Sequence, residues 1–216
     1  MRAVVVAAGD IPADEKWGRW IQPGDLIVAA DGGAARALAR GLVPDVVVGD
    51  MDSVPAEVLA MLEAEHVELV RHPRAKDETD LELALCYAAH QGIKEIVVLG
   101  ALGGRLDHTL SNVLLLALPE LNGVTVRIVR GGEEALLVRD GERAALHGQA
   151  GDVVSLLPWG GDVRGVTTSG LEWPLEHDTL RFAFSRGVSN VMTGEEAWIE
   201  VAEGELMVVR SPAPEE

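Results

Sequence analysis

The sequence lacks most of the features of secreted, membrane-spanning or fibrous proteins. Its single cysteine, Cys86, excludes an internal disulfide and a thiolate zinc site. No apolar run approaches the ~18 residues of a membrane span. The apolar start, residues 3–8, ends at Gly9-Asp10 and is too short for a signal peptide. The 24 glycines and 10 prolines are too few for a low-complexity chain. We therefore expect a globular, cytoplasmic protein.

Positive charge is also scarce. The 216 residues contain 18 Lys and Arg against 35 Asp and Glu, a formal net charge of −17. Such an acidic surface repels nucleic acid and anionic lipid, so neither a nucleic-acid partner nor a membrane partner is expected. A phosphate-bearing ligand stays compatible with this charge if a metal ion and a few local cations reverse the field where it binds.

The first 130 residues alternate apolar runs with helical patterns. The runs are continuous, which is typical of parallel strands covered on both faces. The predicted strands are 3–8, 26–30, 46–49, 67–71, 96–100 and 124–129, and the predicted helices are 34–40, 55–65, 80–89 and 107–118. In the last helix, Leu110, Val113 and Leu114 share one apolar side. Residues 1–132 are thus predicted to form an α/β domain, a mostly parallel sheet flanked by helices.

From residue 133 the pattern changes to short segments without long helices. Expected strands are 135–138, 153–157, 163–168, 180–184, 198–201 and 206–209. Turn sequences such as Asp140-Gly141 and Gly160-Gly161-Asp162 separate them. Residues 133–216 are therefore predicted to form a small antiparallel β domain, a sandwich or a barrel.

Acidic residues follow several of the predicted parallel strands. Ligands of open parallel sheets bind beyond the carboxyl ends of the strands. Asp50 and Asp52 follow strand 46–49, and in an extended backbone their carboxylates would face one spot and suit Mg²⁺. Asp31 ends another strand. The alternative is that these acids only form polar turns.

Residues 76–82, Lys-Asp-Glu-Thr-Asp-Leu-Glu, open a predicted helix. Asp77 is expected as its N-cap and Asp80 in its first turn, where acids interact favourably with the helix dipole. Helix capping explains these acids without any ligand. It does not explain Lys76, which could bind a phosphate instead.

Residues 103–108, Gly-Gly-Arg-Leu-Asp-His, join a strand to a helix. Glycines allow a ligand to approach the backbone, and Arg105 would bind a phosphate in a bidentate manner. Asp107 would cap the helix or hold Arg105, and His108 is either a surface residue or a catalyst. Neither a P-loop motif nor G-x-G-x-x-G occurs, which argues against a P-loop kinase and a dinucleotide dehydrogenase.

Two loops of the β domain, residues 167–173 and 185–190, combine small polar residues with Trp173. From the residues alone, turn chemistry and a core aromatic explain them best.

Together these motifs resemble the thiamine pyrophosphokinase (thiamine diphosphokinase) family. The segments that carry the resemblance are 31–34 (DGGA), 49–53 (GDMDS), 76–85 (KDETDLELAL), 103–112 (GGRLDHTLSN), 168–173 (TSGLEW) and 189–190 (SN). They occur in order and cover nearly the whole chain. Met51 departs from the aromatic residue usual in the family, and its side chain should point away from the acids.

The resemblance implies an α/β nucleotide-binding domain, a β domain and a homodimer with active sites between subunits. It implies the reaction of ATP with thiamine, with Mg²⁺, to give AMP and thiamine diphosphate. It makes Asp50, Asp52 and Asp80 the expected metal ligands, and Gly170, Trp173, Ser189 and Asn190 the expected thiamine pocket. The expected ATP-binding residues are Lys76, Arg105, Asp107 and His108, and the expected catalytic residues are Asp31, Asp52, Asp77, Arg105 and Asp107. Two alternatives remain open: a diphosphokinase of another hydroxymethyl heterocycle such as a pterin, and a non-catalytic thiamine or nucleotide sensor.

Overall fold

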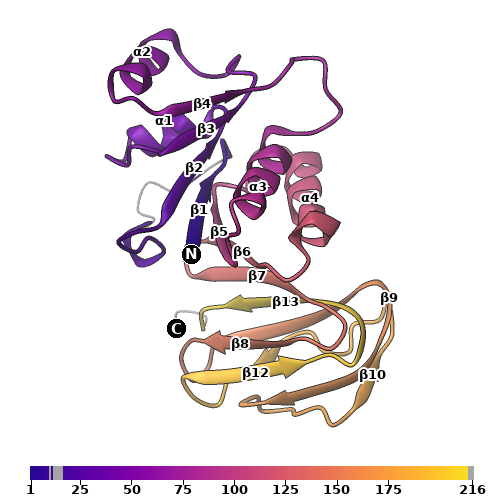
Figure 1. Cartoon of the computed structure of the whole chain (residues 1–216). Helices are drawn as coiled ribbons and strands as arrows, with labels where there is room; N and C mark the ends of the chain where they lie inside the picture. Colours follow the sequence, from indigo (N-terminus) through magenta and orange to yellow (C-terminus); the bar gives the residue numbers. More distant parts are fainter. Residues whose placement is uncertain (10, 12–16, 214–216) are drawn as a thin grey trace. The chain divides into compact units, whose positions relative to one another are not determined.

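The computed structural model describes residues 1–9, 11 and 17–213, and Figure 1 traces their course. The chain divides into two compact units, Met1–Gly131 and Gly132–Glu216. This division falls one residue before the boundary expected from the sequence. No helix in the described part of the chain has both the length and the apolar character needed to cross a bilayer.

The first unit is built on a parallel sheet with strand order β4-β3-β2-β1-β5-β6. Its strands are β1 (Arg2–Val6), β2 (Leu26–Ala30), β3 (Val46–Gly49), β4 (Glu68–Arg71), β5 (Glu95–Leu99) and β6 (Thr125–Arg130). Its helices are α1 (Gly33–Leu38), α2 (Ala56–Ala64), α3 (Asp80–His90) and α4 (Leu106–Leu114), with 3₁₀ turns η1 (Trp17–Arg19), η2 (Leu115–Ala117) and η3 (Pro119–Leu121). The α/β architecture predicted from the apolar runs is confirmed.

The central strands are buried because helices cover both faces of the sheet. α1 packs against β1 and β2, and α3 packs against β1, β2 and β3 from the other side (Figure 1). α3 contributes the buried side chains Leu81, Ala84 and Leu85. The edge strand β4 has no fully buried residue. Since all strands run in parallel, their carboxyl ends meet at one edge of the sheet.

Helix α4 is shorter than predicted. It ends at Leu114 and continues as the 3₁₀ turn η2, and Pro119 follows because its ring and missing N–H do not continue a helix. Its apolar side is exposed in the part of the chain that the structure describes. The exposed fractions of Leu106, Leu110 and Leu114 are 72%, 57% and 57%. The helix therefore presents a row of exposed leucines, four residues apart.

The second unit is an antiparallel β domain, as predicted. Its strands are β7 (Glu133–Val138), β8 (Arg143–His147), β9 (Val153–Ser169), β10 (Asp178–Leu180), β11 (Asn190–Val191), β12 (Glu196–Glu200) and β13 (Glu203–Ser211). The order is β7-β13-β9-β12-β8, and β10 and β11 also pair with β9. Inward-facing residues such as Leu136, Leu156 and Leu206 form one apolar core.

The strands β9 and β10 correct the predictions for this unit. Residues 153–157 and 163–168 belong to a single strand of 17 residues, so the turn expected at Gly160-Gly161-Asp162 is wrong. Gly160 and Gly165 take positive φ values of 70° and 63° and allow the strand to bend, so that it pairs with β13 first and with β12 and β10 later. The strand expected over 180–184 ends at Leu180.

A buried ion network joins the two ends of the second unit. The Arg210 guanidinium donates from Nε to Glu134 Oε1 at 2.7 Å, from Nη1 to Asp152 Oδ2 at 2.8 Å and from Nη2 to the Gly132 carbonyl at 3.1 Å. All three charged side chains are less than a tenth exposed. The network therefore ties the last strand to the segment that begins the unit.

Arg210→Met should destabilise the second unit, because it leaves two buried carboxylates without their cation. The expected loss in free energy of unfolding is ~3–5 kcal/mol, measured by urea denaturation followed by circular dichroism. The matched control is Arg164→Met, which breaks the exposed pair between Arg164 and Glu203 and should cost less than ~1 kcal/mol. Equal losses in both variants would show that the buried network adds nothing.

Candidate active site

Asp31 occupies the end of β2 in a backbone conformation that few residues adopt. Its φ is 42°, and its amide donates to the Val48 carbonyl at 2.9 Å. The side chain is 3% exposed. Oδ2 accepts a hydrogen bond from the Ser53 amide at 3.3 Å, whereas Oδ1 is buried with no partner among the described residues. A buried carboxylate oxygen without a donor is costly and favours a bound cation or proton.

Asp50 and Asp52 lie in a turn after β3, not in an extended strand, so that part of the prediction is wrong. Gly49 has a φ of 152° and Met51 a φ of 65°, and the Asp52 amide donates to Asp50 Oδ1 at 3.0 Å. The Met51 side chain points away from the acids into the core beneath, as expected. The turn nevertheless brings the carboxylates together. One oxygen from each of Asp31, Asp50 and Asp52 lies within 4.8 Å of the others.

Gly49 is needed for this close approach. A Cβ atom at this position would lie 2.8 Å from the Cβ of Asp31 and 2.9 Å from Oδ1 of Asp80. Asp80 is the first residue of α3, so the end of β3, the end of β2 and the start of α3 converge on one point. We call Asp31, Asp50, Asp52 and Asp80 the acidic cluster.

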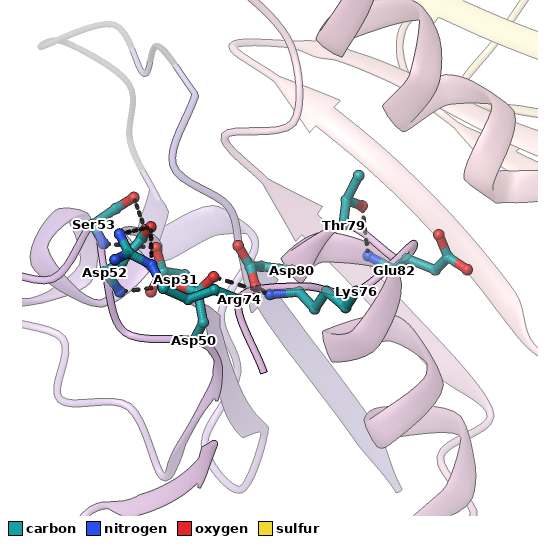
Figure 2. Close-up of polar contacts among 9 residues, drawn as sticks. All are labelled: Asp31, Asp50, Asp52, Ser53, Arg74, Lys76, Thr79, Asp80 and Glu82. Carbon is teal, nitrogen blue, oxygen red and sulfur yellow. Dashed lines mark hydrogen bonds and ion pairs between the residues drawn. The ribbon is translucent and has the colours of Figure 1, made fainter. Parts of the chain in front are cut away.

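Two cations pair with members of the acidic cluster and balance part of its charge (Figure 2). Lys76 Nζ lies 2.8 Å from Asp80 Oδ1 and 3.4 Å from Asp50 Oδ2. The Arg74 guanidinium donates to Asp52 Oδ2 from Nη2 at 2.6 Å and from Nε at 3.1 Å. Lys76 is thus engaged with acids at the site, where the sequence suggested a phosphate.

The acids differ in their proton affinity. Burial, together with the neighbouring charges of Asp80 and Asp50, raises the pKa of Asp31 above its ordinary value despite the hydrogen bond at Ser53. The hydrogen bonds from Arg74 and Ser53 lower the pKa of Asp52. Asp31 is therefore less stable as a free anion than Asp52.

The start of α3 corrects the expected cap. Thr79, not Asp77, is the N-cap, and its hydroxyl accepts from the Glu82 amide at 3.2 Å. Asp77 lies in the preceding turn with an exposed side chain. The structure does not bring it into the acidic cluster.

Beside the acidic cluster lies a cavity of about 480 Å³ at the carboxyl ends of the strands. Its lining includes Asp31, Ser53, Asp80, Arg105, His108 and Asn112. The Arg105 guanidinium binds both carboxylate oxygens of Asp107, at 3.1 and 2.5 Å, and Asp107 also accepts from the His108 amide. Of the two roles expected for Asp107, holding Arg105 is the one observed. The Arg105 side chain is 72% exposed and can exchange this partner for an anion.

The second unit contains its own pocket, of about 280 Å³, lined by Trp173, Leu175, Arg186, Val188 and Asn190 among others. Asn190 is 5% exposed, and its side-chain amide binds the backbone of Trp173. Oδ1 accepts from the Trp173 amide at 3.1 Å, and Nδ2 donates to the Trp173 carbonyl at 2.7 Å. Trp173 is 57% exposed. Asn190 therefore holds the loop that presents an exposed indole at the pocket.

The other two residues expected in this pocket have backbone roles. Ser189 adopts a φ of 62°, and its amide donates to the Ser155 hydroxyl at 3.1 Å. Gly170 lies where a Cβ atom would come within 2.4 Å of the Glu196 carbonyl oxygen. Both residues shape the loops around Trp173, and neither is among the lining residues.

Comparison with known proteins identifies the family. Residues 18–128 match the model of the thiamin pyrophosphokinase catalytic domain, and residues 143–206 match that of the thiamin pyrophosphokinase vitamin B1 binding domain. The chain belongs to the thiamin pyrophosphokinase family.

Individual relatives agree with this assignment. Thiamine pyrophosphokinase 1 of Arabidopsis thaliana is 30% identical over 202 residues, which cover 81% of this chain and 74% of the relative. Thiamine pyrophosphokinase of Bacillus subtilis is 26% identical over 186 residues, 86% and 87% of the two chains. The crystal structure of thiamin pyrophosphokinase from Geobacillus thermodenitrificans superposes with a TM-score of 0.80 at 28% identity, covering 98% of this chain and 97% of the other.

Three residues of the candidate site had no role in the reasoning from sequence. Ser53 donates to Asp31 and Asp52, Asn112 donates to the Ala101 carbonyl in the cavity wall at 2.7 Å, and Arg74 pairs with Asp52. Ser53 and Asn112 lie inside the family motifs, which was the available signal. Arg74 lies outside them, and an exposed arginine between two elements carries no signal of its own.

Asp31→Asn should stabilise the metal-free protein at neutral pH. An acid whose pKa is raised on folding destabilises the folded state above its unfolded pKa, and this penalty disappears as the pH falls toward the ordinary value of 3.8. We expect the melting temperature in EDTA to rise by about 2–4 °C at pH 7, the shift that ~1 kcal/mol gives in a chain of this size, and by less at pH 5. Differential scanning calorimetry measures both.

The control for this variant is Asp178→Asn, because pairing with Arg186 lowers the pKa of Asp178. That variant should not gain stability at pH 7. A melting temperature of Asp31→Asn at or below that of the unaltered chain would contradict the account of Asp31.

Proposed function

We propose that this chain transfers the pyrophosphoryl group of ATP to the hydroxyl of thiamine, giving thiamine diphosphate and AMP. The observation that carries the proposal is the acidic cluster beside the cavity of the first unit. In this cluster, Oδ1 of Asp31 is buried and has no hydrogen-bond partner among the described residues. The match to both family models on one chain supports thiamine over a pterin, and an enzyme over a sensor.

Mg²⁺ fits the residues present at this site. The donors are carboxylate oxygens, which a hard cation prefers, and the buried Asp31 Oδ1 has no other described partner. Asp31, Asp50 and Asp52 would hold the ion. Asp80 lies beside them and pairs with Lys76. When bound, the ion neutralises charge on the polyphosphate and stabilises the charge that develops in the transition state.

The remaining residues of the first unit bind and position the nucleotide. The hydroxyl of thiamine attacks the β-phosphorus and AMP leaves, a reaction that depends on alignment and charge compensation more than on covalent participation by the protein. Arg105 exchanges Asp107 for the polyphosphate and supplies a bidentate cation. Lys76 and His108 are further nucleotide contacts in this proposal, and Asp77 and Asp107 are supporting acids.

In the second unit, Trp173 stacks on the cationic ring system of thiamine. Its indole is exposed but its backbone is fixed by Asn190, so the aromatic platform is formed before the substrate arrives. Preorganisation of this kind lowers the ordering cost of binding. Ser189 and Gly170 contribute to the pocket through the conformation of its loops.

A homodimer with shared active sites completes the proposal. Each unit exposes apolar side chains that a second copy would cover: Leu106, Leu110 and Leu114 on α4, and Trp173, Phe182, Phe184 and Val188 in the second unit. Clusters of exposed apolar residues are typical of association surfaces. A cytoplasmic location stays a prediction.

Asp50→Asn should retain the fold and lose activity. Removing one carboxylate ligand weakens metal stabilisation of the transition state, so AMP formation from ATP, thiamine and Mg²⁺ should fall by about 10²-fold or more. The control is Glu57→Gln, which removes an exposed acid of α2 and should leave the rate unchanged. No thiamine-dependent AMP from the unaltered chain would contradict the proposed function, and an active Asp50→Asn would contradict the cation site.

The shared active site is tested by mixing two inactive variants. Asp52→Asn and Trp173→Ala are unfolded together and refolded, so that about half of the dimers contain one chain of each. If each site takes its acids from one chain and Trp173 from the other, one site of a mixed dimer is intact. About a quarter of all sites should then be active. No recovery, with mixed dimers present and each parent inactive, would contradict sharing.

A further inference from the structure

The segment between β4 and α3 places two cations against the acidic cluster, and they are held very differently. Lys76 Nζ bridges Asp50 and Asp80, and its side chain is 11% exposed. The Arg74 side chain is 76% exposed and binds only Asp52 in the described structure. Figure 2 shows Arg74 reaching Asp52 on the side of the cluster away from α3.

Arg74 binds one of the two carboxylate oxygens that Asp52 could offer to a metal ion. Both of its donors, Nη2 and Nε, converge on Asp52 Oδ2, while Asp52 Oδ1 accepts from the Ser53 hydroxyl at 3.0 Å. Asp52 therefore has both carboxylate oxygens engaged. A divalent ion bound close to Oδ2 of Asp52 would compete with the guanidinium for that oxygen, because two cations beside one carboxylate oxygen repel each other.

The pair between Arg74 and Asp52 is suited to this exchange. Exposed ion pairs contribute little free energy because water screens them, so the guanidinium leaves at small cost. Its planar fork also matches the oxygens of a phosphate. Lys76 is held more firmly than Arg74, since its side chain is largely buried and pairs with two acids.

We propose that Arg74 is an internal competitor for the cation site, bound to Asp52 until a divalent ion replaces it and then transferred to the polyphosphate of ATP. This inference rests on the proposed function and adds a nucleotide-binding residue to it. In the absence of ATP, the divalent ion must compete with Arg74 for Asp52. When ATP is also bound, the displaced guanidinium pairs with the polyphosphate instead. The two ligands then bind more tightly together than separately.

The test compares Arg74→Gln with a matched variant, Arg71→Gln. Arg71 is an exposed arginine of β4. Its Nη2 lies 4.0 Å from Oε1 of Glu63, which is not part of the acidic cluster. Both substitutions are on the surface and remove one positive charge. Manganese binding without nucleotide is measured from the electron paramagnetic resonance signal of free Mn²⁺, and the KM values for ATP and thiamine are measured at saturating Mg²⁺.

Arg74→Gln should bind Mn²⁺ about 2–5-fold more tightly than the unaltered chain. This is the gain in affinity expected when the ion no longer has to break an exposed ion pair. Its KM for ATP should rise at least about threefold, because a charged phosphate contact is lost, with the KM for thiamine unchanged. Arg71→Gln should match the unaltered chain in all three. An unchanged or weaker Mn²⁺ affinity of Arg74→Gln overturns the competition, and an unchanged KM for ATP overturns the transfer to polyphosphate.

Asp50→Asn separates this inference from the proposed function. If Asp50→Asn binds Mn²⁺ as well as the unaltered chain, the acidic cluster is not the cation site and the metal part of the proposed function fails. If Asp50→Asn loses Mn²⁺ binding while Arg74→Gln matches the unaltered chain, the cation site stands and only the role of Arg74 fails.

Discussion

Electrostatic repulsion within the acidic cluster is the constraint on which the rest of this site depends. A parallel sheet brings the carboxyl ends of β2 and β3 to one edge, and α3 starts there, so four carboxylates converge. Like charges at this distance are unstable without cations. Lys76 and Arg74 balance them in part, yet the Asp31 oxygen remains buried and without a described partner. The architecture thus favours an additional cation.

Local backbone strain maintains this arrangement. Asp31 and Met51 both have positive φ values, which cost free energy in residues other than glycine and persist only where the surroundings impose them. Met51 is anchored by its buried side chain, and Gly49 leaves the space in which Asp31 and Asp80 approach. The second unit uses the same means at its pocket, where Ser189 has a positive φ and Asn190 is spent on fixing Trp173. In each unit a buried side chain fixes the backbone beside an exposed functional residue: Met51 next to Asp52, and Asn190 at Trp173.

Much of the fold could be predicted because the signals were local. Continuous apolar runs identified the parallel strands, and the position of the acids after those runs placed them at one edge. The N-cap of α3 was wrongly predicted at Asp77, although a local signal was present: Thr79 followed by Glu82 three residues later is a capping-box pattern.

The failures arose where tertiary contacts overrode local patterns. β9 continues past Gly160 and Gly161, and β13 pairs with it on both sides of these glycines. β8 was not predicted from the sequence, because it has alanines in place of typical strand formers. The geometry around Asp50 could not be read from sequence, since it depends on how Met51 packs. Arg74 was missed for a related reason, because its partner lies 22 residues away.

Anomalous diffraction from crystals grown with Mn²⁺ tests the central claim most directly. The account predicts one strong manganese peak bound by carboxylate oxygens of Asp31, Asp50 and Asp52, with the Arg74 guanidinium no longer on Asp52. A peak elsewhere, or no peak at saturating Mn²⁺ with Arg74 and Lys76 still bound to the acids, would contradict it.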